Sequence, residues 1–97
     1  MTDTGIKPQV LDEIKELAIK HSIDRVILFG SRARGDYHKK SDIDLAVTGG
    51  NTDAFALDIE EMTTTLLEYD IVNLDGSVQE ELLDSIQKEG ILLYEKV

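Results

Sequence analysis

The sequence predicts an α/β (α+β) fold, a small mixed β-sheet covered by helices, and three observations lead to this prediction. The chain has 97 residues, enough for a single domain over residues 1–97 with one thin hydrophobic core. Hydrophobic residues make up 41% of it, too many for a disordered acidic chain. Apolar residues recur with helical and strand periods in turn, so the predicted element order is α-β-β-α-β-α-β.

The N-terminal half is predicted to form one helix and two strands. Pro8 suits the first turn of a helix that ends near His21, since apolar residues follow the proline at helical spacing. Residues 25–29 form a short β-rich run that stops at a glycine, which indicates a buried strand. After a polar, glycine-flanked loop, residues 43–47 alternate with period two and indicate the second strand.

The C-terminal half is predicted to form two helices and two strands. The helix over 53–67 has one apolar face, made by Phe55, Ile59, Met62 and Leu66. Residues 69–74 form the third strand. Ser77 has capping-box spacing to a glutamate and opens the last helix, which Gly90 ends. Residues 91–94 form a last short strand or a packed tail.

The charge and the missing residue types exclude several classes of protein. A net charge of −10 disfavours binding to a DNA or RNA backbone and to anionic membranes, since both need a basic face. The absence of cysteine excludes disulfides, thiolate nucleophiles and cysteine-based zinc sites. The N-terminus lacks the basic start and apolar core of a signal peptide, and the apolar runs are far shorter than a membrane span. We therefore expect a cytoplasmic protein.

Two carboxylates at the start of the second strand indicate either a metal site or, as is common for a D-x-D alone, the polar face of an edge strand. Asp42 and Asp44 are two residues apart, so both side chains point to one face of the strand. Neighbouring carboxylates repel one another, and a divalent cation that binds both removes this repulsion. With only two histidines in the chain, a bound metal must be held mainly by carboxylates, which favours Mg²⁺, Mn²⁺ or Ca²⁺.

The turn before these carboxylates indicates an anion site. Gly30 ends a strand and Ser31 begins a short helix, where backbone N–H groups and the serine hydroxyl can bind phosphate. Residues 30–40 carry four positive charges and one negative charge, a local +3 in an otherwise acidic chain. A basic turn beside a carboxylate pair suits a nucleoside triphosphate bound with its metal. The chain contains neither a P-loop motif nor a dinucleotide-binding glycine motif.

Gly30-Ser31, ten residues and then Asp42-x-Asp44, with a strand on either side, resembles the motif of the polymerase-beta-like nucleotidyltransferase superfamily. The fuller runs G-S-R-A-R-G and S-D-I-D-L resemble those of its minimal nucleotidyltransferases (MNT). The resemblance implies ATP as the substrate and two Mg²⁺ ions, or Mn²⁺, bound by these two carboxylates and a third one. Asp70 on the third strand matches the third position, and Asp75, past the strand end, is the alternative.

The resemblance also implies roles for the loop and a reaction. Gly30, Ser31, Arg32 and Arg34 would bind the nucleotide, and Asp70 would help to deprotonate the attacking hydroxyl. For each arginine the alternative is a solvated loop charge or a salt bridge. The reaction would transfer a nucleoside monophosphate, AMP from ATP, to a hydroxyl.

We expect a separate partner to supply the hydroxyl that takes up the nucleotide, because a chain this short has no acceptor-binding domain. Proteins that resemble this one are commonly paired with a HEPN-domain toxin protein, which implies a hetero-oligomer and an antitoxin that adenylylates a tyrosine. Two alternatives remain open at this point. A non-catalytic binding module would neutralise its partner by contact, which the acidic surface favours. A small-molecule, antibiotic-type adenylyltransferase would need a second domain to close over its acceptor.

Overall fold

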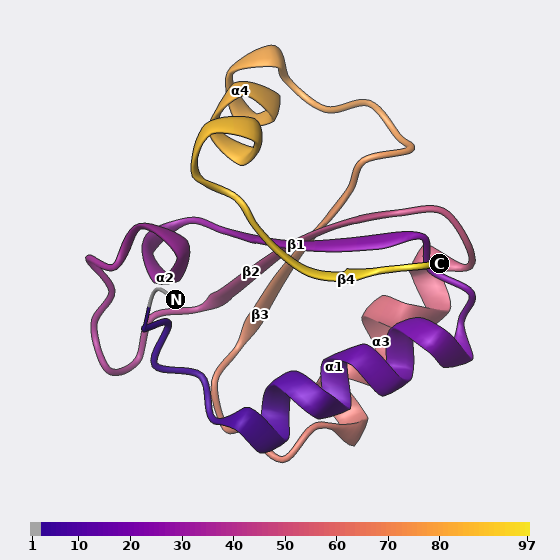
Figure 1. The fold of residues 1–97 in the computed structure, drawn as a ribbon, viewed down its shortest axis with the longest axis horizontal. Coiled ribbons are helices and arrows are strands. Elements are labelled where there is room, and N and C mark those ends of the chain that lie inside the picture. The colour runs from indigo at the N-terminus through magenta and orange to yellow at the C-terminus, as the bar shows by residue number, and fades with distance from the viewer. Residues whose placement is uncertain (1–2) are drawn as a thin grey trace.

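The computed structural model describes residues 3–97 and has a four-stranded sheet at its centre, in the order β3-β2-β1-β4 (Figure 1). The strands are β1 (Arg25–Phe29), β2 (Ile43–Thr48), β3 (Tyr69–Asn73) and β4 (Ile91–Glu95). β1 pairs antiparallel with both β2 and β4, whereas β2 and β3 are parallel. The sheet is therefore mixed, as the sequence predicts.

Helices lie on both faces of this sheet. α1 (Pro8–Lys20) and α3 (Thr52–Met62) lie against one face, and α4 (Glu80–Glu89) lies against the other (Figure 1). α3 is the crossover that a parallel pair such as β2 and β3 requires. The short helix α2 (Ser31–Arg34) follows β1 directly. Within residues 3–97 no helix is long and apolar enough to cross a membrane.

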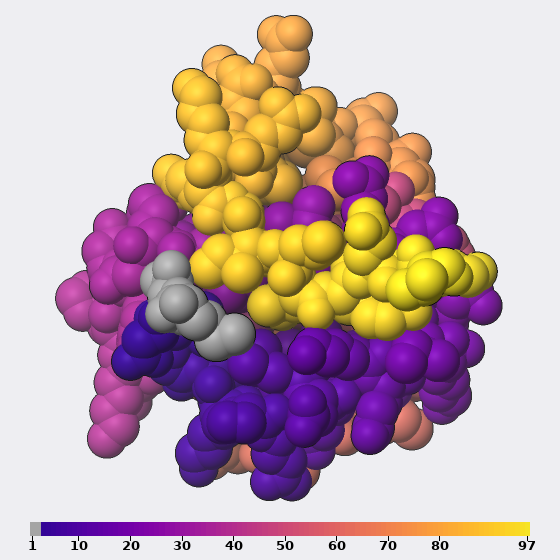
Figure 2. Space-filling view, in the orientation of Figure 1, coloured from indigo at the N-terminus to yellow at the C-terminus, as the bar shows by residue number. Residues whose placement is uncertain are grey.

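The core is divided unequally between the two faces of the sheet. The larger part lies under α1 and α3, and its fully buried side chains include Ile14, Leu28, Leu45, Phe55 and Ile59. The smaller part lies under α4 and contains three buried residues, Phe29, Ala46 and Ile86. Figure 2 shows α4 as a projection above the body of the molecule, with β4 open to solvent beside it. The sheet is thus well covered on one face and only partly covered on the other.

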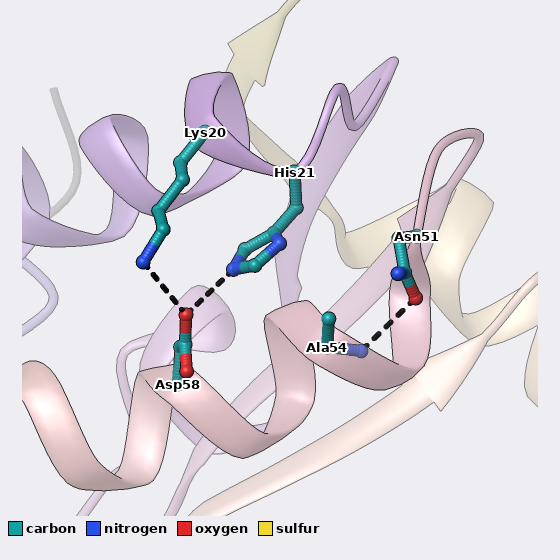
Figure 3. A network of polar contacts seen from close by, with 5 residues as sticks. All are labelled: Lys20, His21, Asn51, Ala54 and Asp58. Atoms are coloured by element: carbon teal, nitrogen blue, oxygen red, sulfur yellow. Dashed lines mark hydrogen bonds and ion pairs between the residues drawn. The ribbon is translucent and has the colours of Figure 1, made fainter.

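A small polar network holds α1 and α3 together (Figure 3). His21, at the end of α1, lies with Nε2 2.7 Å from Oδ2 of Asp58 on α3, and Lys20 Nζ lies 3.2 Å from the same oxygen. Hydrogen bonds from His21 and Lys20 lower the pKa of Asp58. Asn51 caps α3 by accepting a hydrogen bond from the backbone nitrogen of Ala54, 3.1 Å away. His21 therefore has a structural role.

Two helix boundaries differ from the predicted ones. α3 ends at Met62 rather than at residue 67, because three β-branched threonines follow and Thr63 takes an extended conformation. As a result, Met62 and Leu66 are 54% and 102% exposed instead of completing the apolar face of the helix. α4 begins at Glu80, and its N-cap is Gln79 without a side-chain bond, so Ser77 is not its cap. This start places acidic residues in the first turn, near the positive end of the helix dipole.

Candidate active site

The turn between β1 and α2 brings the backbone close to a carboxylate. Gly30 has φ 75° and ψ −157°, a conformation that is essentially restricted to glycine. A Cβ atom at this position would overlap Oδ2 of Asp44. The carbonyl oxygen of Gly30 accepts hydrogen bonds from the backbone nitrogens of Ala33 and Arg34, both 3.1 Å away, which fixes the first turn of α2. The backbone of Gly30 therefore lies directly beside the side chain of Asp44.

Asp44 is also adjacent to the third carboxylate. The parallel register pairs Asp44 on β2 with Asp70 on β3, while the antiparallel register pairs Asp44 with Phe29 at the end of β1. Asp42 lies just before β2 and is exposed. Burial raises the pKa of Asp44 to about 6, and the charges of Asp70 and Asp42 act in the same direction. Asp42 and Asp70 are thus close enough for their charges to act on Asp44.

The three carboxylates have the chemistry needed to bind a divalent metal ion. Carboxylate oxygens are the ligands that Mg²⁺ and Mn²⁺ prefer, and a cation would offset the repulsion that Asp42 and Asp70 exert on Asp44. Across residues 3–97 no three histidine, aspartate or glutamate side chains converge as a preformed metal cluster. Asp42, Asp44 and Asp70 are therefore the residues that could hold a metal, and their side chains would have to turn toward it.

Arg32 is buried and hydrogen-bonded to backbone oxygens. Its side chain is 1% exposed, and its guanidinium donates to the carbonyl oxygens of Thr4 (2.9 Å), Lys39 (3.3 Å) and Ser41 (3.0 and 2.9 Å). The guanidinium carbon also lies 4.8 Å from the centre of the Tyr37 ring, within the range of a cation–π contact. In this structure Arg32 holds the loop together through backbone carbonyls, and its contact with the nucleotide stays a prediction.

Arg34 is the arginine of the loop that stays at the surface. It donates to Asp36 (3.3 Å) and to Glu89 at the end of α4 (3.0 Å), with 43% of its side chain exposed. The charge of Arg34 lowers the pKa of Asp44 and so opposes the effect of the neighbouring carboxylates. Arg34 can therefore supply positive charge beside the Gly30 turn.

Asp75, the alternative third carboxylate, lies at the other end of the sheet. It accepts hydrogen bonds from the hydroxyl of Thr48 (2.5 Å) and the backbone nitrogen of Gly49 (2.7 Å), which lie at the C-terminal end of β2. Asp42 and Asp44 mark the N-terminal end of the same strand. Asp75 thus joins two loops, and the register leaves Asp70 as the carboxylate beside Asp44.

Sequence reasoning missed one feature of this region. A hollow of about 430 Å³ lies beside Asp42 and is lined by Lys40, Asp42, Leu66, Leu67 and Glu68. Helical spacing places Leu66 on a buried face, so nothing in that pattern indicates that this exposed residue borders the site. The only available signal is the threonine run that ends α3 before this residue.

Known proteins resemble this chain in sequence. The model of the family described as polymerase beta, nucleotidyltransferase matches residues 12–97. A relative from Methanocaldococcus jannaschii, named "Putative protein adenylyltransferase MJ0604", is 36% identical over 81 residues, which cover 74% of this chain and 79% of the relative.

Two solved structures are similar over most of the chain. A crystal structure of a toxin-antitoxin with AMP-PNP has a TM-score of 0.71 and 25% identity, covering 89% of this chain and 73% of that one. A structure described as a "putative minimal nucleotidyltransferase" has a TM-score of 0.64 and 29% identity, covering 84% of this chain and 86% of that one. The family match over residues 12–97 and the 36% identical relative show that this chain belongs to the polymerase beta nucleotidyltransferase family.

Proposed function

We propose that the protein transfers AMP from ATP to a hydroxyl group of a partner protein, and that it acts in this way as an antitoxin. The observation that carries the proposal is the position of Asp44, which lies between the Gly30 turn and Asp70. A phosphate-binding turn and paired carboxylates are the parts that nucleotidyl transfer needs. The relative named as a protein adenylyltransferase supports AMP as the group transferred and a protein as the acceptor.

The residues of the site divide into three roles. The backbone at Gly30 and Ser31 would bind the β- and γ-phosphates, and Arg34 would add positive charge beside them. Asp42, Asp44 and Asp70 would hold two Mg²⁺ ions, or Mn²⁺, which supply charge neutralisation at the phosphate oxygens when bound. Arg32 would hold the loop in position through its bonds to backbone carbonyls.

The transfer step is a displacement at phosphorus. The acceptor oxygen attacks the α-phosphorus of ATP and forms a new P–O bond. The bond from that phosphorus to the oxygen bridging to the β-phosphate breaks, and pyrophosphate leaves with the electron pair. The carboxylate of Asp70 accepts the proton of the acceptor hydroxyl. Asp70 is exposed in the structure, so an incoming hydroxyl can reach it.

The partner that we propose is a HEPN-domain toxin protein, with a tyrosine as the acceptor and the cytoplasm as the compartment, where ATP is available. A toxin-antitoxin among the similar structures supports this pairing. The net charge of −10 also favours association with a basic, RNA-cutting protein, because opposite charges increase the rate of encounter.

The test uses α-labelled ATP, Mg²⁺ and the protein encoded by the adjacent reading frame. We expect label on that partner only when both proteins are present, and a loss of at least about 100-fold when Asp42 and Asp44 are both replaced by asparagine. Asp12→Asn, an exposed carboxylate on α1, is the matched control and should keep full transfer. The proposal is overturned if the partner is never labelled, or if the double asparagine variant still transfers AMP.

The acidic surface favours a second candidate, neutralisation of the partner by contact alone. The same variant separates the two functions. If the double asparagine variant still protects cells from the partner, contact is sufficient. If protection is lost together with transfer while the complex still forms, catalysis is required.

A further inference from the structure

The hollow beside Asp42 is lined by both apolar and charged side chains. Leu66 and Leu67 supply apolar surface, Lys40 supplies one positive charge, and Asp42 and Glu68 supply negative charge. Its volume of about 430 Å³ is within the usual range of ligand-binding clefts, about 300–1,000 Å³. The hollow is therefore large enough to hold a side chain of another molecule.

The strand order puts this hollow and the Gly30 turn on opposite sides of the carboxylates. β2, which carries Asp44, lies between β1 and β3. Gly30 and Ser31 follow β1, whereas Leu66, Leu67 and Glu68 precede β3. The backbone nitrogen of Ile43 donates to the carbonyl oxygen of Glu68 at 2.9 Å, which holds the hollow against the start of β2.

In a displacement at phosphorus, the leaving pyrophosphate and the attacking acceptor lie on opposite sides of the reacting phosphorus. The attacking and leaving oxygens lie roughly in line with the phosphorus. If the β- and γ-phosphates bind at the Gly30 turn, pyrophosphate leaves on the β1 side, so the attacking oxygen must approach from the β3 side. Asp70, the proposed proton acceptor, is on β3, two residues after Glu68.

We propose that the hollow binds an aromatic acceptor side chain, a tyrosine whose phenolic hydroxyl takes up AMP; this assignment rests on the proposed function. The ring packs on Leu66 and Leu67, and the hydroxyl points toward the carboxylates. The bonds formed and broken are those of the transfer step described above. The phenolic oxygen attacks the α-phosphorus, pyrophosphate leaves, and the phenolic proton passes to Asp70. A serine or threonine would leave both leucines uncovered.

The exposure of Leu66 is consistent with this role. Single exposed leucines are common on protein surfaces, and Leu57 on α3 is one, with 65% exposure. Leu66 is fully exposed and borders a hollow that contains a proposed metal ligand, whereas Leu57 does not line this hollow. Leu57 therefore provides an exposed control of the same residue type away from the hollow.

The experiment compares Leu66→Ser, Leu66→Met and Leu57→Ser with the wild type. It measures the Kd of Mg²⁺–ATP by calorimetry and the KM for the adjacent-gene protein in the labelling assay. For Leu66→Ser we expect the acceptor KM to rise about tenfold with the ATP Kd unchanged, because loss of one leucine contact costs about that factor. Leu66→Met should restore most of the affinity, Leu57→Ser should change neither constant, and mass spectrometry should find AMP on a tyrosine.

Three results would overturn the assignment. One is an unchanged acceptor KM in Leu66→Ser. The second is a raised ATP Kd in that variant, which would show that the hollow holds the base of the nucleotide. The third is AMP found on a serine, threonine or lysine. If the wild type transfers nothing at all, the proposed function itself is overturned, and the acceptor assignment is lost with it.

Discussion

The guanidinium of Arg32 donates two hydrogen bonds to the carbonyl oxygen of Ser41, from Nε at 3.0 Å and from Nη2 at 2.9 Å. Ser41 immediately precedes Asp42, so this contact fixes the backbone from which a proposed metal ligand projects. A third bond, from Nη1 to the carbonyl oxygen of Thr4, ties the same guanidinium to the N-terminal segment. A buried arginine thus joins separate stretches of backbone beside the carboxylates.

Replacing this residue should disturb both stability and the site. Arg32→Met removes every donor to three backbone carbonyls, which should lower the free energy of unfolding by about 2–4 kcal/mol. It should also weaken Mg²⁺–ATP binding, because the loop that carries Asp42 is no longer held. Urea unfolding and calorimetry measure the two effects. Arg34→Met, at an exposed ion pair, should leave the free energy of unfolding nearly unchanged; equal losses in both variants would contradict this account.

Gly30 should tolerate no side chain. Gly30→Ala puts a Cβ atom onto Asp44 Oδ2 and forces alanine to a positive φ, so we expect a loss of stability of about 2 kcal/mol or more and a loss of transfer. Gly76→Ala is the matched control, since a Cβ there meets only Asn73 O at 3.6 Å, an ordinary contact. Thermal unfolding and the labelling assay compare the two variants. An active, stable Gly30→Ala protein would show that the turn does not need glycine.

Asp44 should destabilise the fold at neutral pH when no metal is bound. Its folded pKa of about 6 lies above its usual value, so the carboxylate favours unfolding above that pH, and the penalty disappears below pH ~4. Asp44→Asn should therefore be more stable than the wild type at pH ~7.5 by about 1 kcal/mol, a value reduced for partial solvent exposure.

Urea unfolding of both proteins in EDTA at about pH 7.5 and about pH 4 measures this difference. The gain should be present only at the higher pH. Added Mg²⁺ should raise the melting temperature of the wild type and leave that of Asp44→Asn nearly unchanged. A variant that is less stable than the wild type at the higher pH would contradict the prediction.

Asp70 and Asp75 should respond in opposite ways to the same substitution. Hydrogen bonds from Thr48 and Gly49 lower the pKa of Asp75, so its carboxylate stabilises the fold above its unfolded pKa and loses this effect as the pH falls through the folded pKa. Asp75→Asn should therefore reduce stability at neutral pH and keep transfer. Asp70→Asn should keep stability and reduce transfer about 100-fold or more. A pair of melting curves and labelling assays checks both, and the reverse pattern would make Asp75 the catalytic carboxylate.

The strands can be predicted from the sequence because their apolar runs are short and end at glycine or at polar turns. Residues 25–29 and 43–47 form strands nearly as predicted. The predicted second helix is too long, because Met62 and Leu66 continue the helical apolar period while the intervening threonines end the helix. Periodicity is a property of spacing alone, and it does not report the backbone preference of the residues in between.

The site is predictable in its residue types but not in all of its contacts. The spacing of Gly30, Asp42 and Asp44 by itself indicates a phosphate and metal site. The burial of Arg32 cannot be foreseen, because its partner Thr4 is 28 residues away and contributes only a backbone oxygen. Contacts of this kind are independent of the partner's side chain, so they leave no pattern in the sequence.

The parallel pairing of β2 and β3 also determines when the protein can become active during its synthesis. Asp44 and Asp70 meet only after the α3 crossover has brought β3 alongside β2. A nascent chain that has emerged only as far as α3 contains the glycine-serine turn and the first two aspartates, but no partner for Asp44. Since pairing of distant segments is slow compared with helix formation, nucleotide transfer should begin only after β3 has left the ribosome and joined the sheet.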